Sequence, residues 1–113
     1  MIVVHGLKNC DTCRKAVRWL DTTGQAARLR DFRSEPPATA EIETWLAAIG
    51  SDKLVNRRST TWRTLPETDR EQAPVHLLEQ HPTLIKRPVI EAEGKLYCGF
   101  DEAVCRSLSD LGT

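Results

Sequence analysis

The order of predicted elements indicates an α/β fold built on a mixed four-stranded sheet flanked by helices. An apolar, β-branched segment at residues 1–7 leads directly into a segment of helical periodicity that starts at Thr12. A second alternating segment follows at residues 27–32. Two further short strands, separated by a turn, precede a last helix near the C-terminus.

Length and charge limit the classes of protein to consider. The chain has 113 residues, 40% apolar and 28% charged, which predicts one domain over residues 1–113. Basic and acidic residues number 16 each, so the net charge is zero and indicates neither direct nucleic-acid binding nor an anionic membrane as partner. No apolar stretch approaches the roughly 20 residues that a membrane-spanning helix needs. Neutral charge and the absence of a heptad pattern favour a monomer.

The N-terminal segment does not resemble a signal peptide, because no basic region precedes its apolar residues and no small-residue cleavage site follows them. We therefore expect a cytoplasmic protein in a reducing compartment. Permanent disulfides are uncommon there, so the four cysteines indicate thiol chemistry or metal binding instead. They are Cys10, Cys13, Cys98 and Cys105.

The first three elements are bounded by local signals. The strand at residues 1–7 stops near Gly6, and the helix that starts at Thr12 stops at Gly24. The alternating segment at 27–32 is the second strand. A strand, a helix and a strand in this order predict a right-handed crossover with parallel pairing.

The middle of the chain is predicted to be a helical insertion over about residues 39–81. Thr39 is expected to cap a helix that ends at Gly50. The segment 54–65 is predicted to form a turn and a short helix, and the segment 74–81 another helix.

The C-terminal part predicts an antiparallel hairpin, with "EAEG" at 91–94 as its turn. Arg87-Pro88 precedes its first strand, and Asp101 is expected to cap the last helix. A parallel pair combined with this hairpin gives a thioredoxin-like arrangement, with the helical insertion as a side lobe.

Cys10 lies at the junction of the first strand and the first helix. Backbone N–H groups and the positive end of the helix dipole favour thiolate there, and thiolate is the reactive species. Cys13, one turn into the helix, is close enough to form a disulfide after Cys10 has been attacked. Lys8 and Arg14 add positive charge nearby. These features indicate a nucleophilic or redox-active thiol, in which Cys13 is optional.

Two other interpretations of the cysteines stay open. Both N-terminal cysteines can be ordinary semi-buried residues. Zinc would need a second pair of ligands, and Cys98 and Cys105 are separated by six residues across a strand–helix boundary, which is unlike structural zinc sites. We therefore expect no metal and place these two in the core. The three histidines have no metal-ligand spacing and are expected at structural or surface positions: His5, His76 and His81.

Two arginine segments are candidate anion sites. In a thioredoxin-like fold the proline before the third strand is cis and lies against the reactive thiol, so we predict a cis Arg87–Pro88 bond. Arg87 would then lie near Cys10 and bind an oxyanion or a carboxylate; the alternative is a surface arginine in an ordinary ion pair. Arg57 and Arg58, in "RRSTTWR", are either solvated or part of an anion pocket.

Three segments together resemble the arsenate reductase (ArsC)-related family of thioredoxin-fold proteins, which also contains the Spx regulators. The segments are "GLKNCDTCRKAVRWL", "NRRSTTWRTL" and "LIKRPVIEAEGKLYCGFDE", and the resemblance runs nearly end to end. Within the family, "KNCDT", "TTWR" and "IKRP" are most similar to the YffB branch of glutathione-dependent thiol reductases.

The resemblance implies roles for particular residues. The family's nucleophile corresponds to Cys10, and its central anion-binding arginine to Arg58, with Arg57 as the alternative. Its arginine before the cis proline corresponds to Arg87, and that proline to Pro88. The implied activity is glutathione-dependent thiol–disulfide exchange on a small anionic or disulfide substrate. Glutathione would be co-substrate, glutaredoxin a further candidate partner, and no cofactor would be bound.

Two alternative functions follow from where the chain departs from its relatives. Arsenate reductases carry a further arginine after the last strand, where this chain has Gly99 and Phe100. Losing one charge-assisted contact of about 1.5–3 kcal/mol argues against arsenate turnover.

Spx proteins share the Cys10–Cys13 pair, and the glycine with which they engage RNA polymerase aligns with Gly50. They are longer, with a basic C-terminal tail.

Overall fold

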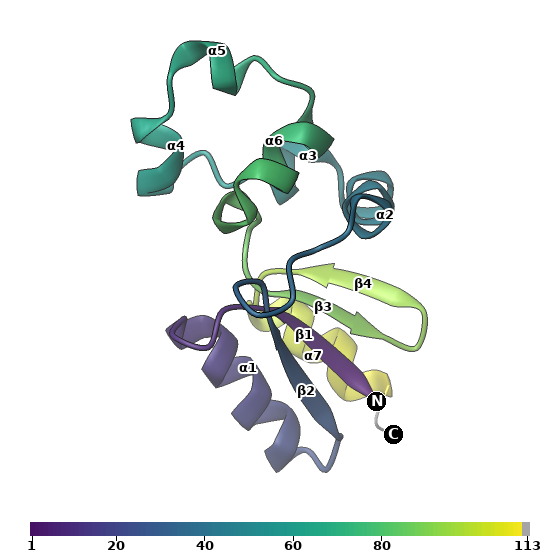
Figure 1. Cartoon of the computed structure of the whole chain (residues 1–113). Helices are drawn as coiled ribbons and strands as arrows, with labels where there is room; N and C mark the ends of the chain where they lie inside the picture. The colour runs from purple at the N-terminus through teal and green to yellow at the C-terminus, as the bar shows by residue number, and fades with distance from the viewer. Residues whose placement is uncertain (112–113) are drawn as a thin grey trace. The chain divides into compact units, whose positions relative to one another are not determined.

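The computed structural model describes residues 1–111, which divide into two compact units. Unit 1 comprises Met1–Glu35 and the segment that starts at Arg87, and unit 2 comprises Pro36–Lys86. Unit 1 contains the whole sheet, and unit 2 is helical (Figure 1). The predicted insertion of about residues 39–81 lies within unit 2, which extends a few residues further at both ends.

The sheet of unit 1 is mixed, as predicted, and its strand order is β2-β1-β3-β4. β1 pairs in parallel with β2, and both other pairings are antiparallel. β1 pairs with one neighbour on each side, so its C-terminal end and the loop after it lie near the middle of the sheet. The strands are β1 Ile2–Gly6, β2 Ala27–Asp31, β3 Val89–Ala92 and β4 Lys95–Cys98.

Two helices, α1 (Asp11–Thr22) and α7 (Glu102–Leu111), share one apolar core with the strands of unit 1 (Figure 1). Side chains alternate along a strand, so only every second residue of β1 can join this core. Trp19 and Phe100 meet edge-to-face at its border, with ring centroids 5.8 Å apart. The buried core residues are Ile2, Val4, Ala16, Leu20, Ile90, Ala92, Val104 and Leu108.

The hairpin of β3 and β4 has a shorter turn than expected. The strands continue through Ala92 and from Lys95, which leaves only Glu93 and Gly94 between them. Both have positive φ, 50° and 77°. Two such residues match the right-handed twist of a hairpin, so the turn needs two residues and the four-residue "EAEG" prediction was wrong.

Unit 2 contains five α-helices and a 3₁₀ turn, more elements than were predicted. The additional ones span three or four residues, too short for hydrophobic periodicity to appear in the sequence. α2 packs against α6, and their buried residues are Ile42, Trp45, Leu77 and Leu78. The helices are α2 Thr39–Ile49, α3 Ser51–Leu54, α4 Thr60–Thr64, α5 Glu67–Arg70 and α6 Pro74–Gln80, followed by the 3₁₀ turn Pro82–Leu84.

One predicted helix cap is wrong and one is confirmed. The N-cap of α2 is Ala38, not Thr39, because the Glu41 carboxylate accepts the Ala38 N–H at 3.0 Å. Asp101 does cap α7, accepting the Val104 N–H at 2.9 Å.

Candidate active site

Cys10 is the N-cap of α1, with extended backbone angles of φ −94° and ψ 120°. Its carbonyl accepts the Arg14 N–H at 3.0 Å, the first hydrogen bond of the helix. The side chain therefore lies where the backbone N–H groups of the first turn are unpaired. Cys10 is half-buried and Cys13 fully buried, and both are free thiols. An incoming molecule can therefore reach Cys10 but not Cys13.

The surroundings of Cys10 favour its thiolate. Partial burial raises the pKa of the thiol, but the backbone N–H and the thiol of Cys13 lower it, and so does the Arg87 guanidinium. The lowering effects dominate, and the pKa lies below its ordinary value of 9.0. A depressed pKa together with access from solvent is the combination that marks reactive cysteines.

Cys13 has the opposite character. Burial and the adjacent Cys10 sulfur raise the pKa of the Cys13 thiol to about 12, against the effects of the Leu7 backbone and Arg87. Cys13 therefore keeps its proton at neutral pH and directs it at the Cys10 sulfur. The two cysteines form an unequal pair: an accessible thiol whose pKa is lowered and a buried thiol whose pKa is raised.

Gly6 makes room for this pair, a role that the sequence analysis missed. A Cβ placed on Gly6 would lie 2.3 Å from Cys13 Sγ and 3.9 Å from Arg87 Cβ. A glycine that ends a strand before a reactive cysteine is a usable signal, because glycine also marks close backbone approach. From the sequence alone, Gly6 indicated only the end of a strand.

Arg87 and Pro88 join the site from the start of β3. Their peptide bond is cis, Arg87 is half-buried, and Pro88 is buried. The Pro88 carbonyl accepts the Gly99 N–H at 2.8 Å. The Arg87 guanidinium interacts with the Cys10 sulfur, so a permanent positive charge lies beside that sulfur.

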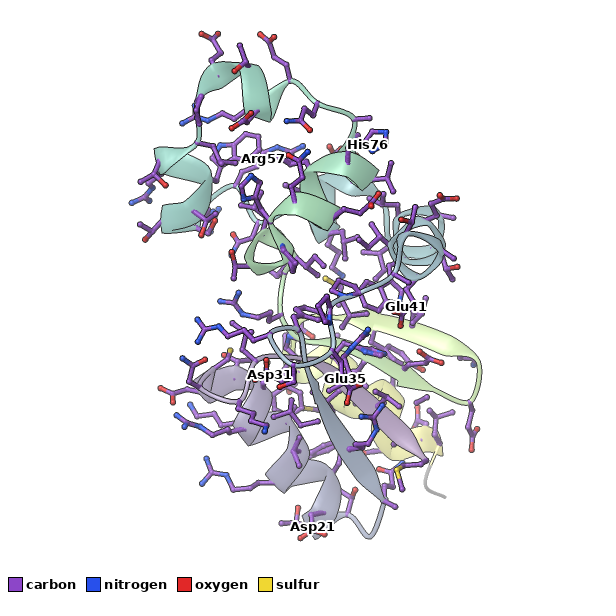
Figure 2. The ribbon with its side chains drawn as sticks, viewed as in Figure 1. Asp21, Asp31, Glu35, Glu41, Arg57 and His76 are labelled. Carbon is purple, nitrogen blue, oxygen red and sulfur yellow. The ribbon has the colours of Figure 1, made fainter. Side chains whose placement is uncertain are left out.

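The loop between β1 and α1 is held by Asp31, at the end of β2 (Figure 2). One carboxylate oxygen accepts the Lys8 backbone N–H at 2.9 Å, and the other accepts the Arg33 N–H at 2.7 Å. These two bonds lower the pKa of Asp31. Lys8, predicted as an anion-binding residue, is thus held by its backbone N–H. Its ammonium is exposed and interacts electrostatically with the Asp31 carboxylate.

The remaining predicted residues, Arg57, Arg58 and Gly50, belong to unit 2. Both arginines are exposed and line a groove in that unit. Gly50 joins α2 to α3 with φ 92°, and a Cβ there would meet no atom within 4 Å. Its backbone conformation alone therefore accounts for a glycine at this position.

A polar pair on β1 and β2 was also missed. His5 and Arg30 are buried, 4% and 6% exposed, and Arg30 Nη1 lies 3.1 Å from His5 Nδ1. A guanidinium only donates, so Nδ1 accepts and Nε2–H donates to Glu91 at 3.2 Å. His5 is thus a buried structural residue, in line with the prediction that the histidines occupy structural or surface positions.

Neither metal ligation nor membrane insertion finds support in residues 1–111. They contain no group of three or more His, Cys, Asp or Glu that could hold a metal ion. No helix among them combines the length and apolar character that crossing a membrane requires.

The two C-terminal cysteines differ in burial: Cys98 is buried and Cys105 is half-buried. Partial burial and the nearby carboxylates of Asp101 and Glu102 raise the pKa of the Cys105 thiol.

The fold and the cysteine at the N-cap of α1 define a thioredoxin-like protein with a half-buried, accessible thiol whose pKa is lowered. The chain belongs to the ArsC family, whose model matches residues 5–108. This finding confirms the resemblance inferred from the three segments.

Individual relatives cover nearly the whole chain. An uncharacterized protein of Haemophilus influenzae is 41% identical over 106 residues, which is 90% of this chain and 93% of that protein. The global transcriptional regulator Spx of Listeria innocua is 31% identical and aligns over 90% of this chain and 82% of its own length.

Solved structures agree with the fold. The YffB protein has a TM-score of 0.87 at 31% identity, covering 95% of this chain and 97% of YffB. An arsenate reductase-related protein of Brucella melitensis has a TM-score of 0.73 at 34% identity, covering 94% and 92%. The family thus includes relatives named for arsenate reductase and relatives named as regulators.

Proposed function

We propose that this protein is a glutathione-dependent thiol–disulfide oxidoreductase with Cys10 as its nucleophile. The unequal cysteine pair carries the proposal: Cys10 is accessible with a lowered pKa, and Cys13 is buried with a raised one. A nucleophilic thiol must be reachable and readily ionised, and of these two cysteines Cys10 is the one that is accessible and whose pKa is lowered.

The exchange proceeds in two balanced steps. The Cys10 thiolate attacks one sulfur of a substrate disulfide, forms a mixed disulfide, and expels the other half as a thiolate that takes up a proton. Glutathione thiolate then attacks the mixed disulfide, restores the Cys10 thiolate, and leaves as a disulfide with the substrate half. A second glutathione reduces that product, so two glutathiones supply the two electrons.

Glutathione suits the resolving step better than Cys13. A resolving thiol must ionise, and burial, the main cause that raises the pKa of Cys13, persists when Cys10 is part of a mixed disulfide. In this proposal Cys13 donates its proton toward the Cys10 thiolate, and Arg87 holds an anionic part of the substrate beside the sulfur.

Steady-state turnover of a small disulfide, such as hydroxyethyl disulfide, tests the proposal with glutathione as reductant. Activity should require glutathione, disappear in Cys10→Ser and persist in Cys13→Ser. Cys105→Ser is the matched control, because it removes a half-buried thiol outside the site. Turnover that survives Cys10→Ser would refute the proposed nucleophile.

A redox-sensing regulator that binds RNA polymerase is the second candidate. The Spx relative and the shared Cys10–Cys13 spacing favour it. A sensor should form the Cys10–Cys13 disulfide on mild oxidation, bind RNA polymerase through the Gly50 region, and turn over nothing. Mass spectrometry of the oxidised protein and a polymerase pull-down with Gly50→Arg separate this function from the reductase.

Arsenate reduction is the third candidate, favoured by the Brucella relative. Gly99, at the position of the expected further arginine, has φ 84°. An arginine there would be strained, because this is left-handed backbone. We therefore expect no arsenate-dependent oxidation of glutathione, and Gly99→Arg should not create it.

A further inference from the structure

Unit 1 carries an open groove of about 550 Å³ between α1 and β2, termed here the edge groove. Its volume falls in the range of roughly 300–1,000 Å³ that is usual for binding pockets. Its apolar side chains are half-buried and pack against the core of unit 1, whereas its two arginines are exposed. The lining residues are Val17, Leu29, Arg14 and Arg18.

β2, which borders the edge groove, lies at one edge of the sheet (Figure 1), and β1 is its only neighbour among the strands of residues 1–111. The Ile2 N–H donates to the Ala26 carbonyl at 3.0 Å, and the Phe32 N–H donates to the Gly6 carbonyl at 2.9 Å. Backbone groups alternate in direction along a strand, so the even-numbered residues of β2 bond β1. Leu29 therefore directs its N–H and its carbonyl to the open edge, where they can bond an added strand.

An added strand would place every second side chain on the side of the edge groove. Leu29 is the register partner of Val4, which belongs to the core shared with α1, so Leu29 faces α1. The residue opposite Leu29 on an added strand, and the residues two positions away from it, point the same way. The first meets the apolar surface of Val17 and Leu29, and the others lie on the side of the two arginines.

The edge groove retains positive charge. Arg14 forms an ion pair with Asp11 on the same helix. Over residues 1–111, however, no carboxylate oxygen lies within 4.0 Å of the guanidinium nitrogens of Arg18. An exposed guanidinium beside an apolar surface is complementary to a segment that carries a carboxylate next to an apolar side chain.

A second copy of β2 does not match this edge. Antiparallel pairing of β2 with itself over all five residues would place Leu29 opposite Leu29 and Arg28 opposite Arg30. Like charges directly opposite each other destabilise a strand pair. The edge is therefore complementary to an acidic strand rather than to itself.

We infer that β2 and the edge groove bind an extended segment of another protein, which adds to the sheet as a further strand. The segment carries an apolar side chain opposite Leu29 and an acidic side chain two positions away. Main-chain hydrogen bonds supply affinity, and the alternate side chains supply specificity. All these residues belong to unit 1 and none is Cys10, so binding does not depend on the proposed function.

Fluorescence anisotropy of the full chain tests this inference with a labelled synthetic peptide, in which threonine alternates with glutamate, isoleucine and glutamate. In a reference peptide both glutamates are replaced by lysine. We expect the glutamate peptide to bind with a Kd below about 1 mM and the lysine peptide to bind about 10-fold more weakly. Added salt should reduce this difference. Equal affinities of the two peptides, or no binding of either at about 1 mM, would overturn the inference.

Backbone methylation distinguishes strand addition from charge attraction alone. In antiparallel pairing the isoleucine N–H of the peptide faces Leu29, and in parallel pairing the N–H of the following threonine does. Methylation of one of these two nitrogens should weaken binding about 10-fold, and methylation of the other should weaken it much less. Equal affinities of the two methylated peptides would refute strand addition.

Charge reversal locates the binding site. Arg18→Glu should weaken binding of the glutamate peptide about 5-fold or more and strengthen binding of the lysine peptide. Lys95→Glu reverses an exposed cation on β4, the opposite edge strand, and should change either affinity less than about 2-fold. Circular dichroism checks that each variant folds. Equal effects of Arg18→Glu and Lys95→Glu would contradict binding at the edge groove.

Cys10→Ser separates this inference from the proposed function. The variant should bind the glutamate peptide as the wild type does, even if turnover of disulfides is lost. Loss of peptide binding in Cys10→Ser would place the peptide at the thiol and overturn the edge groove, whatever the result of the turnover assay.

Discussion

The Cys13 sulfur lies where a side chain on Gly6 would have to be. A Cβ at residue 6 would be 2.3 Å from Cys13 Sγ, well inside van der Waals contact. The strand end can therefore accept the buried thiol only because residue 6 has no side chain. Burial in turn raises the pKa of Cys13 and keeps its proton available to Cys10.

Replacing Gly6 by alanine should destabilise the protein by about 1–3 kcal/mol, the usual cost of overpacking. Urea unfolding measures this loss of free energy, provided that the m value, the slope against urea concentration, is the same for both proteins. Cys13→Ala removes the sulfur that the new methyl group would meet. Adding Gly6→Ala to Cys13→Ala should therefore cost much less free energy of unfolding than Gly6→Ala costs in the wild type. Additive losses would contradict a direct clash.

Removing the Arg87 charge should raise the pKa of Cys10. Arg87→Gln takes away one of the groups that favour the thiolate, so half-maximal alkylation by iodoacetamide should move to higher pH. Arg18→Gln, also on the exposed face of α1 but one turn further from Cys10, is the matched control and should leave the profile in place. Coincident profiles for wild type and Arg87→Gln would rule out this arginine as a stabiliser of the thiolate.

Cys13 should act on Cys10 as a donor rather than as a disulfide partner. Cys13→Ala removes the thiol donor and should raise the pKa of Cys10, whereas Cys13→Ser restores a donor and should shift it less. The same alkylation profiles measure both variants. The opposite ranking of alanine and serine would favour packing over hydrogen bonding as the role of residue 13.

Asp31 should make stability depend on pH in the acid range. Its pKa is lowered in the folded protein, chiefly by the backbone N–H groups of Lys8 and Arg33. The carboxylate thus contributes stability fully above its unfolded pKa of about 3.9, and the contribution is lost as pH falls through the folded value. Asp31→Asn should be less stable than wild type at pH 7.

Urea unfolding of both proteins from pH 7 to pH 2.5 measures this dependence, and the difference between them should shrink as the pH falls. A difference that stays constant over that range would assign the effect of the variant to lost packing or geometry.

The buried contact between His5 and Arg30 should contribute to stability through its acceptor. His5→Leu removes the Nδ1 that accepts from Arg30 Nη1, and we expect a loss of about 1–3 kcal/mol. Glu91→Gln should cost less than about 1 kcal/mol, because the Glu91 side chain is 51% exposed. Thermal unfolding measures both variants, and equal losses would show that the exposed carboxylate matters as much as the buried nitrogen.

Part of the fold could be predicted because it depends on short-range patterns. The apolar, β-branched run of β1, the alternation of β2, the glycine stop of α1 and the Asp101 cap all appear within a few residues of sequence. The helices α3 and α5 have four residues each, barely one turn, so a hydrophobic period cannot repeat within them. The cap of α2 and the two-residue hairpin turn depended on a Glu41 hydrogen bond and on backbone angles, neither of which is visible in the sequence.

The sequence by itself determined that Cys10 stands at a helix N-terminus, because the strand before it and the periodicity after it are local. It also placed Cys13 one turn further on and Arg87 before a proline. Only the tertiary structure decided that Cys13 is buried against Gly6, that Arg87 lies beside the Cys10 sulfur, and that Lys86 pairs with the backbone of Leu54. Burial and charge proximity link residues distant in the chain, and these long-range contacts set the two thiol pKa values.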